Sequence, residues 1–251
     1  MRLIKSELFK LKRISGLHLV YIFPLVMSGI AMFEMLRRID VSPANQIIPP
    51  YSSFYFQFFG LFSPIVIALI LFSFIQIENK NKMWESNYLL PISKGTIYVG
   101  KIFTSVLFAL AYCVISYLTY IGQVLLCQAF YPEHLALNQD DNIVLIIFFS
   151  RMFLVLAFYS LLVIPVFIYI ESAITALGIF MFFIFLSFFL MQKSWFTYYP
   201  FSYHLTVLTN FRSAYDIVKD KGAWITMIYA LCAFLTGKFL FQNVSPRSSS
   251  N

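Results

Sequence analysis

The stretch Tyr55–Ile77, YFQFFGLFSPIVIALILFSFIQI, contains no charged residue and is long enough to cross a bilayer as a helix. A span needs about 20 apolar residues, because the hydrocarbon core is about 30 Å thick and a helix rises about 1.5 Å per residue. The whole chain has this character, since 60% of its 251 residues are hydrophobic and 12% are charged. Soluble domains contain about 25% charged residues. The sequence therefore predicts an all-α integral membrane protein.

Further apolar runs bring the number of predicted transmembrane helices to six. They are Leu17–Leu36, Ile102–Cys127, Ile143–Ile170, Ala173–Gln192 and Gly222–Gln242. One membrane domain over residues 17–242 accounts for all of them, and no separate soluble domain is expected. The polar tail, residues 243–251, is expected to be mobile.

The distribution of lysine and arginine predicts that both termini of this multi-pass protein face the cytoplasm. With the N-terminus inside, the inner segments carry 11 basic residues and the outer loops carry 6. Basic residues accumulate in cytoplasmic loops, so outer loops are expected at Arg37–Phe54, Gln128–Asn142 and Lys193–Lys221. The net charge of +7 then reports topology and contact with anionic lipid. No nucleic-acid partner is expected.

Residues 1–16 have the pattern of an amphipathic helix. Ile4, Leu8 and Leu11 recur at helical spacing, and the basic residues lie off this stripe. Such a helix would lie in the inner headgroup layer of the membrane. The alternative is a cluster of positive charges that only sets orientation, and the residues do not separate the two.

The connector Glu78–Lys101, ENKNKMWESNYLLPISKGTIYVGK, combines charge with an apolar ridge. The ridge consists of Met83, Trp84, Tyr88, Leu89 and Leu90. Pro91 would end a helix here, and Ser93 would cap the next one. An exposed ridge of this kind suits a groove on a partner protein. The alternative is an interfacial helix with Trp84 lying in the headgroups.

No catalytic or metal-binding motif is found in the sequence. Gly95–Lys101 fits G-x-x-x-x-G-K, but Ile102 stands where a phosphate loop has Ser or Thr, and the segment leads into a membrane helix. His18, His134 and His204 lie in separate segments without ligand spacing, and interfacial positions are expected for them.

Arg151 is a charged residue within the fourth apolar run. One possibility is that Arg151 marks the outer interface, which would make Ile143–Ser150 an interfacial or re-entrant stretch. The other is that Arg151 lies deeper, where it should face the bundle interior and have a partner, because an unpaired charge in lipid is costly.

The Glu78–Lys101 connector resembles the first cytoplasmic loop of type-2 ABC transporter permeases. That family has an acidic residue closing the second span, a short helix often with Trp, a Leu-rich stretch into Pro-[Ile/Val]-Ser-[Arg/Lys], and a Gly-Lys or Ala-Lys pair. Glu78, Trp84, Leu89–Lys94 and Gly100–Lys101 match these features. The glycine often found shortly before the Trp is absent.

Within that family, the chain is most similar to the lantibiotic-immunity and phenol-soluble modulin (cytolytic peptide) exporters. The Arg151-Met-Phe-Leu stretch fits that group, and Tyr199-Pro200-Phe201-Ser202 matches a Pro-Phe-Ser stretch of relatives. The cargo implied by the resemblance is an amphipathic antimicrobial or cytolytic peptide. A drug, a lipid-linked precursor or sodium is the alternative cargo. The aromatic content of 20% suits either a peptide path or simple helix packing.

The resemblance implies a six-span permease domain with a short cytoplasmic coupling helix in its 78–101 loop. A separate ABC ATPase dimer would bind ATP and Mg, so no cofactor and no ATPase site are expected in this chain. A second permease subunit, identical or a sister chain, is also implied. Residues assigned to ATPase coupling are Glu78, Trp84, Glu85, Leu89, Leu90, Pro91, Ser93 and Lys94.

Outside the transport class, a scaffold or an intramembrane enzyme remains. An enzyme would need Arg151, His18 and Glu171 to converge.

Overall fold

The computed structural model describes residues 18–38, 48–80, 93–131, 139–170, 172–209 and 220–243, and every regular element in these ranges is a helix. In chain order these are α2 (Leu19–Arg38), α3 (Ile48–Lys80), α5 (Lys94–Phe130), α6 (Gln139–Tyr169), α7 (Ala173–Leu190), η3 (Phe196–Tyr198), α8 (Tyr203–Thr209) and α9 (Lys221–Asn243). The predicted all-α class is confirmed. The surface helix predicted at 1–16, the coupling helix and residues 244–251 lie outside the described residues.

Each of the six predicted apolar runs has most of its residues in one of these helices. In the described part of the chain, four helical stretches are long and apolar enough to cross a membrane: Tyr55–Gln76, Lys94–Phe130, Ile143–Tyr169 and Lys221–Asn243. Leu19–Glu34 and Ile174–Leu190 are shorter apolar helices. The chain is therefore built as a multi-pass helical membrane protein.

Several helices extend well beyond the predicted spans. Helix α3 begins at Ile48, inside the predicted outer loop 37–54, with Pro49 and Pro50 in its first turn. Proline is tolerated there because first-turn N–H groups have no partner within the helix. Helix α5 runs for 37 residues, whereas α7 has 18.

Helix α6 is continuous from Gln139 to Tyr169, so the suggested separate stretch at Ile143–Ser150 is wrong. The physical reason is that no glycine or proline separates this stretch from Arg151. The helical hydrogen bonding therefore continues through it.

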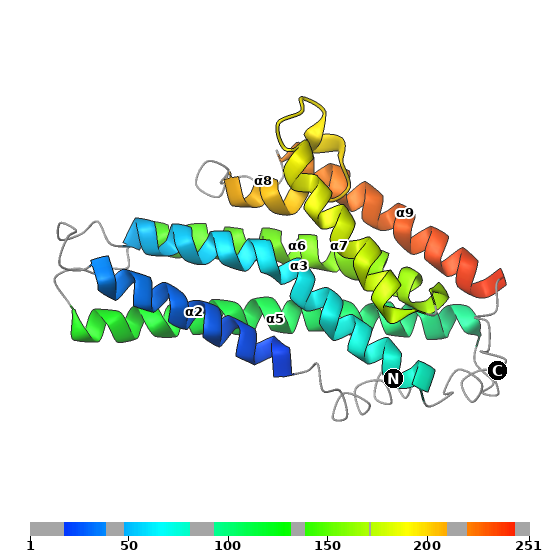
Figure 1. The fold of residues 1–251 in the computed structure, drawn as a ribbon, viewed down its shortest axis with the longest axis horizontal. Coiled ribbons are helices and arrows are strands. Elements are labelled where there is room, and N and C mark those ends of the chain that lie inside the picture. Colours follow the sequence, from blue (N-terminus) through cyan, green and yellow to red (C-terminus); the bar gives the residue numbers. More distant parts are fainter. Residues whose placement is uncertain are drawn as a thin grey trace.

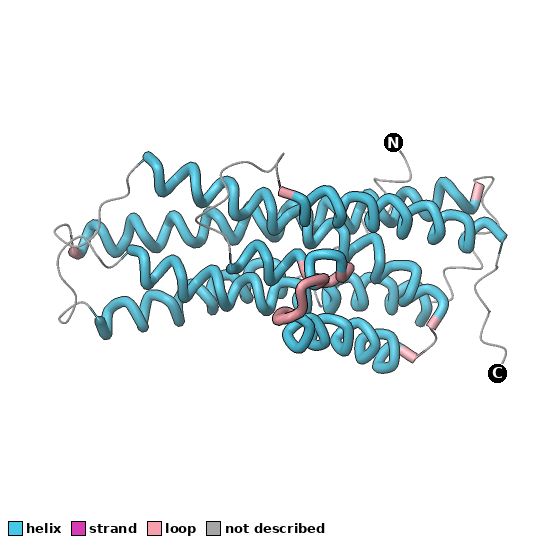
Figure 2. The backbone as a smooth tube through the Cα atoms, turned by 90° about the horizontal axis from the view of Figure 1, so that it is seen from above, coloured by secondary structure: helices cyan, strands magenta, loops and turns pink. Residues whose placement is uncertain are grey.

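Helix α6 is the centre of the fold, because it packs against α3, α5 and α9. Helices α2, α3, α5 and α6 run lengthwise beside one another, and α7, α8 and α9 lie along one side of that group (Figures 1 and 2). Helix α8 contacts α3, α6 and α9 and falls inside the loop predicted at Lys193–Lys221. No helix was predicted there.

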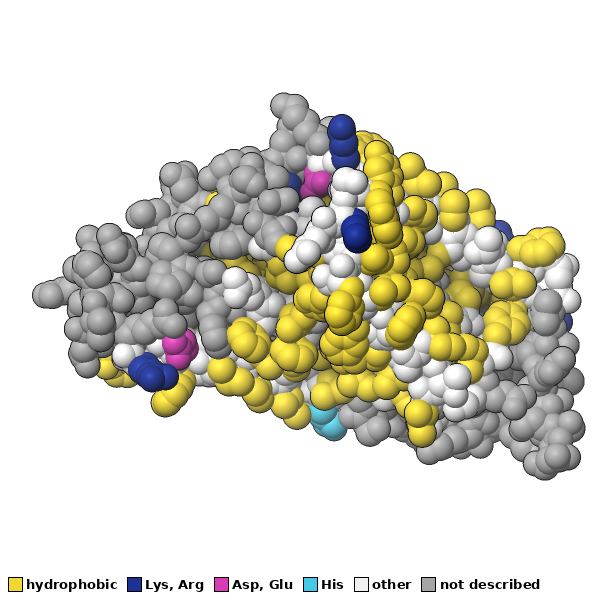
Figure 3. All heavy atoms as spheres, turned by 45° about the horizontal axis from the view of Figure 1, so that its top comes forward, with side chains coloured by type: hydrophobic (Ala, Val, Ile, Leu, Met, Phe, Trp, Pro, Cys, Tyr) yellow, Lys and Arg dark blue, Asp and Glu magenta, His cyan; other side chains and the backbone are white. Residues whose placement is uncertain are grey.

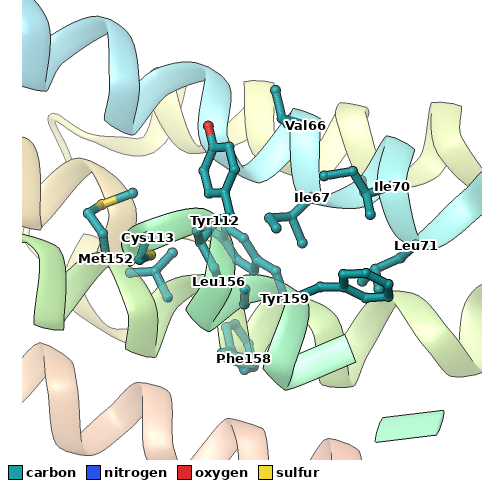
Figure 4. Packing of buried hydrophobic residues seen from close by; sticks show 14 of the residues in the cluster. Val66, Ile67, Ile70, Leu71, Tyr112, Cys113, Met152, Leu156, Phe158 and Tyr159 are labelled. Carbon is teal, nitrogen blue, oxygen red and sulfur yellow. The ribbon is translucent and has the colours of Figure 1, made fainter. Parts of the chain in front are cut away.

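The core is dominated by aliphatic and aromatic side chains from α3, α5 and α6. Ile67 and Leu71 of α3, Tyr112 of α5 and Leu156 of α6 all belong to this core and are fully buried (Figure 4). The Phe59 and Tyr112 rings stack with centroids 5.5 Å apart. Much of the aromatic content therefore packs helices together.

The outside of the bundle is apolar, and hydrophobic atoms cover much of the face shown in Figure 3. Phe33 of α2 is 70% exposed, Ile174 of α7 is 86% exposed and Phe189 of α7 is 79% exposed. Soluble monomers rarely expose large contiguous apolar patches. These surfaces suit lipid.

Candidate functional site

The predicted coupling segment is described only at its two ends. Ser93 and Lys94 are described in full, and Glu78 is described only as part of the α3 backbone. The other predicted coupling residues lie outside the described residues: Trp84, Glu85, Leu89, Leu90 and Pro91. The described part of the candidate site is therefore the junction between this segment and α5.

The coupling segment ends in a capped helix start. Ser93 is the N-cap of α5, and its hydroxyl accepts a hydrogen bond from the Thr96 backbone N–H at 3.3 Å. This satisfies one of the first-turn donors that no helical carbonyl reaches. The predicted capping role of Ser93 is confirmed. The cap joins the last residue of the coupling segment's Pro-Ile-Ser stretch to the first turn of α5.

The Gly95–Lys101 stretch is helical throughout, within the first two turns of α5. A phosphate loop needs backbone N–H groups that are free to face phosphate, and those of a continuous helix are not. Gly95 is instead buried, and an added Cβ would lie 2.5 Å from the side-chain nitrogen of Gln242 on α9. The glycine serves close packing of α5 on α9.

Tyr98 joins α5 to α9 and α6 one turn further along. Its side chain is fully buried between the Phe234 and Phe241 rings of α9, with centroids 6.1 and 5.6 Å away. A Cβ added at Gly237 would overlap the Tyr98 hydroxyl and lie 2.9 Å from Cγ of Pro165 on α6. Gly237 is thus the notch that admits Tyr98, and this contact is called the Tyr98 notch below.

Lys101 is a second unexpected feature of the same end of α5. Its side chain is fully buried, and its ammonium lies 5.4 Å from the centroid of the Phe74 ring on α3. An ammonium over an aromatic face is stabilised by the ring quadrupole. The start of α5 is therefore attached to α3 as well as to α9.

Arg151 lies in a polar cluster near the middle of α6, at the start of α9. It is 1% exposed, and its Nη2 lies 3.8 Å from Oδ2 of Asp220, which immediately precedes α9. The Tyr203 hydroxyl of α8 donates to the same oxygen at 3.0 Å, and the Gly222 N–H donates to Oδ1 at 2.9 Å. Asp220 and Tyr203 were missed in the sequence because their partner is distant along the chain.

His204, expected at the interface, is fully buried beside this cluster. Its Nδ1 lies 2.7 Å from the Tyr159 hydroxyl of α6, and its ring packs edge-on against Phe188. Burial lowers the pKa of His204 from 6.5 to about 4, so the ring is neutral near pH 7. His18 is exposed, and its interfacial position stays a prediction; His134 lies outside the described residues.

The comparison with known protein families identifies the family of this helical bundle. The model of the ABC-2 family transporter protein matches residues 3–187, nearly three quarters of the chain. The chain belongs to the ABC-2 transporter family. No curated protein and no solved structure matches it.

Membership of the ABC-2 family makes this chain the membrane-spanning component of an ABC exporter. Such a component works with a separate ABC ATPase and is generally not itself catalytic. Among the described residues, no group of three or more His, Cys, Asp or Glu side chains is placed to hold a metal. The match includes the coupling segment and Arg151 and ends before Tyr203 and Asp220.

Proposed function

We propose that this ABC-2 chain exports its cargo when a cytoplasmic ABC ATPase dimer moves the 78–101 loop. The observation that carries this proposal is the Tyr98 notch, which lies within two turns of Ser93, the residue that caps the start of α5 in that loop. A push on the loop reaches Ser93, moves α5 as a rigid rod, and displaces α9 and α6 through Tyr98. The protein thereby shifts between two packed arrangements, as alternating access requires.

In this proposal the apolar ridge of the loop forms a short coupling helix whose Trp84 and Leu89 enter a cleft of the ATPase. Buried aromatic anchors dominate many protein interfaces. Glu78 and Lys94 flank the ridge and would make charged contacts at the rim. Six spans, cytoplasmic termini and a surface helix at 1–16 complete the arrangement, with a second identical or sister permease subunit.

We further propose an amphipathic antimicrobial or cytolytic peptide as the cargo. The support is the sequence resemblance to exporters of such peptides, including Arg151-Met-Phe-Leu at the middle of α6. The exposed apolar surfaces of α2 and α7 would let such a peptide approach from the lipid side. A drug, a lipid-linked precursor or sodium is the alternative.

Co-purification with an ABC ATPase of the same genome tests the proposal. The complex should form and hydrolyse ATP, and vesicles containing it should transport a fluorescent amphipathic helical peptide. An ATPase subunit without its phosphate-loop lysine should abolish transport. Trp195, half-exposed beyond the far end of α7, offers a matched control: Trp195→Ala should leave the complex intact, whereas Trp84→Ala should weaken it. Failure of any ATPase to associate would overturn the proposal.

A further inference from the structure

The side chain of Asp220 connects three helices through one carboxylate. Oδ2 accepts a hydrogen bond from Tyr203 of α8 and lies near Arg151 of α6, while Oδ1 accepts from the Gly222 N–H in the first turn of α9. An added Cβ at Gly222 would lie 2.8 Å from Cδ2 of Tyr203 and 3.3 Å from Oδ1 of Asp220. Gly222 therefore allows this close approach. The contact is called the Asp220 junction below.

The charge pair within the Asp220 junction is buried but incomplete. The 3.8 Å separation of Arg151 Nη2 and Asp220 Oδ2 is longer than a hydrogen bond. In the described part of the chain, Nε and Nη2 of Arg151 have no hydrogen-bond partner. The two groups attract each other by charge without the paired hydrogen bonds of a close arginine–carboxylate contact. Such a pair specifies a position and can still separate.

The first half of α9 contacts the bundle along one side only. Gly222, Ala223 and Thr226 are buried, whereas Trp224, Ile228 and Leu231 are each more than half exposed. The Asp220 junction is a polar attachment at the start of α9, and two turns further along the Tyr229 hydroxyl donates to the Tyr198 carbonyl at 2.8 Å. The other end of α9 is attached differently, because Tyr98 fits sterically into the Gly237 notch.

These two attachments give α9 the form of a lever. We propose that the Asp220 junction is a latch, which holds α8 and the start of α9 against α6 at rest and separates when the exporter opens. Arg151, Asp220 and Tyr203 are positioning residues in this mechanism. Movement of α5 turns α9 about the Tyr98 notch, and the strain falls on the incomplete pair at the far end. The latch rests on the proposed export function.

The test measures whether the buried side of α9 becomes accessible to water when the latch is weakened. In a chain with Cys113, Cys127 and Cys232 replaced by alanine, Ala223→Cys places a thiol at a 2% exposed position beside the junction. A water-soluble maleimide should label it slowly in the resting permease and faster in the complex with the ATPase during ATP turnover. Asp220→Asn should raise the resting rate, and Tyr203→Phe should raise it about fivefold, as expected for one lost hydrogen bond.

A thiol at Ala109→Cys, fully buried in α5, is the matched control for general loosening. It should stay unlabelled in every variant. If Asp220→Asn also exposes position 109, the variant has unfolded, and Tyr203→Phe, which retains both charges, decides the question. Unchanged labelling at position 223 in Tyr203→Phe would overturn the latch. The resting measurement needs no ATPase, so failure of the ATPase to associate would refute the export proposal without deciding the latch.

Discussion

Replacing Gly237 by alanine tests whether Tyr98 fixes α9 to α5. The added methyl group would overlap the Tyr98 hydroxyl and approach Cγ of Pro165 to 2.9 Å. Overpacking of this kind costs about 1–3 kcal/mol, because both neighbours are held in the core. Alanine also stabilises a helix interior by about 1 kcal/mol relative to glycine. We therefore expect the free energy of unfolding of Gly237→Ala to fall by about 0–2 kcal/mol.

Gly122→Ala is the matched control, since Gly122 lies inside α5 and an added Cβ there meets nothing within 4 Å. This variant should gain about 1 kcal/mol from helix propensity alone. The difference between the two variants isolates the steric cost, about 1–3 kcal/mol. Thermal or denaturant unfolding of the detergent-solubilised protein measures it.

Tyr98→Phe supplies the rescue. The Tyr98 hydroxyl has no hydrogen-bond partner among the residues that the structure describes, so its removal alone should cost little. In the Gly237→Ala background it removes the atom nearest to the added methyl group, and part of the steric cost should be recovered, because Cζ of residue 98 and Cγ of Pro165 still lie 2.9 Å from the added Cβ. The reasoning is refuted if Gly237→Ala and Gly122→Ala agree within about 0.5 kcal/mol, or if the second change rescues nothing. Export should be impaired by Gly237→Ala and not by Gly122→Ala.

Further predictions concern coupling, topology and pH. Trp84→Ala or Leu89→Ala should weaken ATPase association by about 2 kcal/mol, or roughly 30-fold in Kd, without affecting membrane insertion; binding titrations measure this, and unchanged affinity would remove the ridge from the interface. A cysteine at Asn138 should react with an impermeant reagent from outside and one at Asn81 should not, and the opposite pattern would reverse the topology. His204 takes up a proton more readily unfolded than folded, because its pKa is lowered from 6.5 to about 4. Stability should therefore be level above pH 6.5 and fall as the pH drops from 6.5 towards 4. His204→Gln should lose that part of the slope in unfolding measurements at pH 7 and pH 5, and an identical slope would contradict the assignment.

The fold class was accessible from the sequence because an uninterrupted apolar run such as Tyr55–Ile77 has only one favourable solvent. The Ser93 cap was equally predictable, since the signal is local. Helix ends were not, because polar residues such as Gln139 and Lys94 begin a helix before the apolar run starts. Hydropathy marks the hydrocarbon and carries no information about where helical hydrogen bonding stops.

The Asp220 junction and the Tyr98 notch depend on pairs of residues far apart along the chain. The sequence shows that Arg151 needs a partner, but no pattern near Arg151 predicts that this partner is Asp220. A glycine inside an apolar helix likewise gives no sign of what fills its empty side. His204 is buried because α8 packs on α6. A helix of seven residues within a predicted loop is too short to show the helical period of apolar residues in the sequence.

The unequal lengths of α5 and α7 also have a consequence for the surrounding membrane. With 37 and 18 residues, the two helices are about 55 Å and 27 Å long. A hydrocarbon layer about 30 Å thick matches α7 when that helix stands nearly upright, whereas α5 must tilt, protrude or thicken the lipid beside it. The perimeter of one subunit therefore presents helices of two different lengths to the bilayer. If α5 stands as upright as α7, the lipid chains next to α5 are stretched relative to those next to α7, and a tilt of α5 relative to α7 removes this difference.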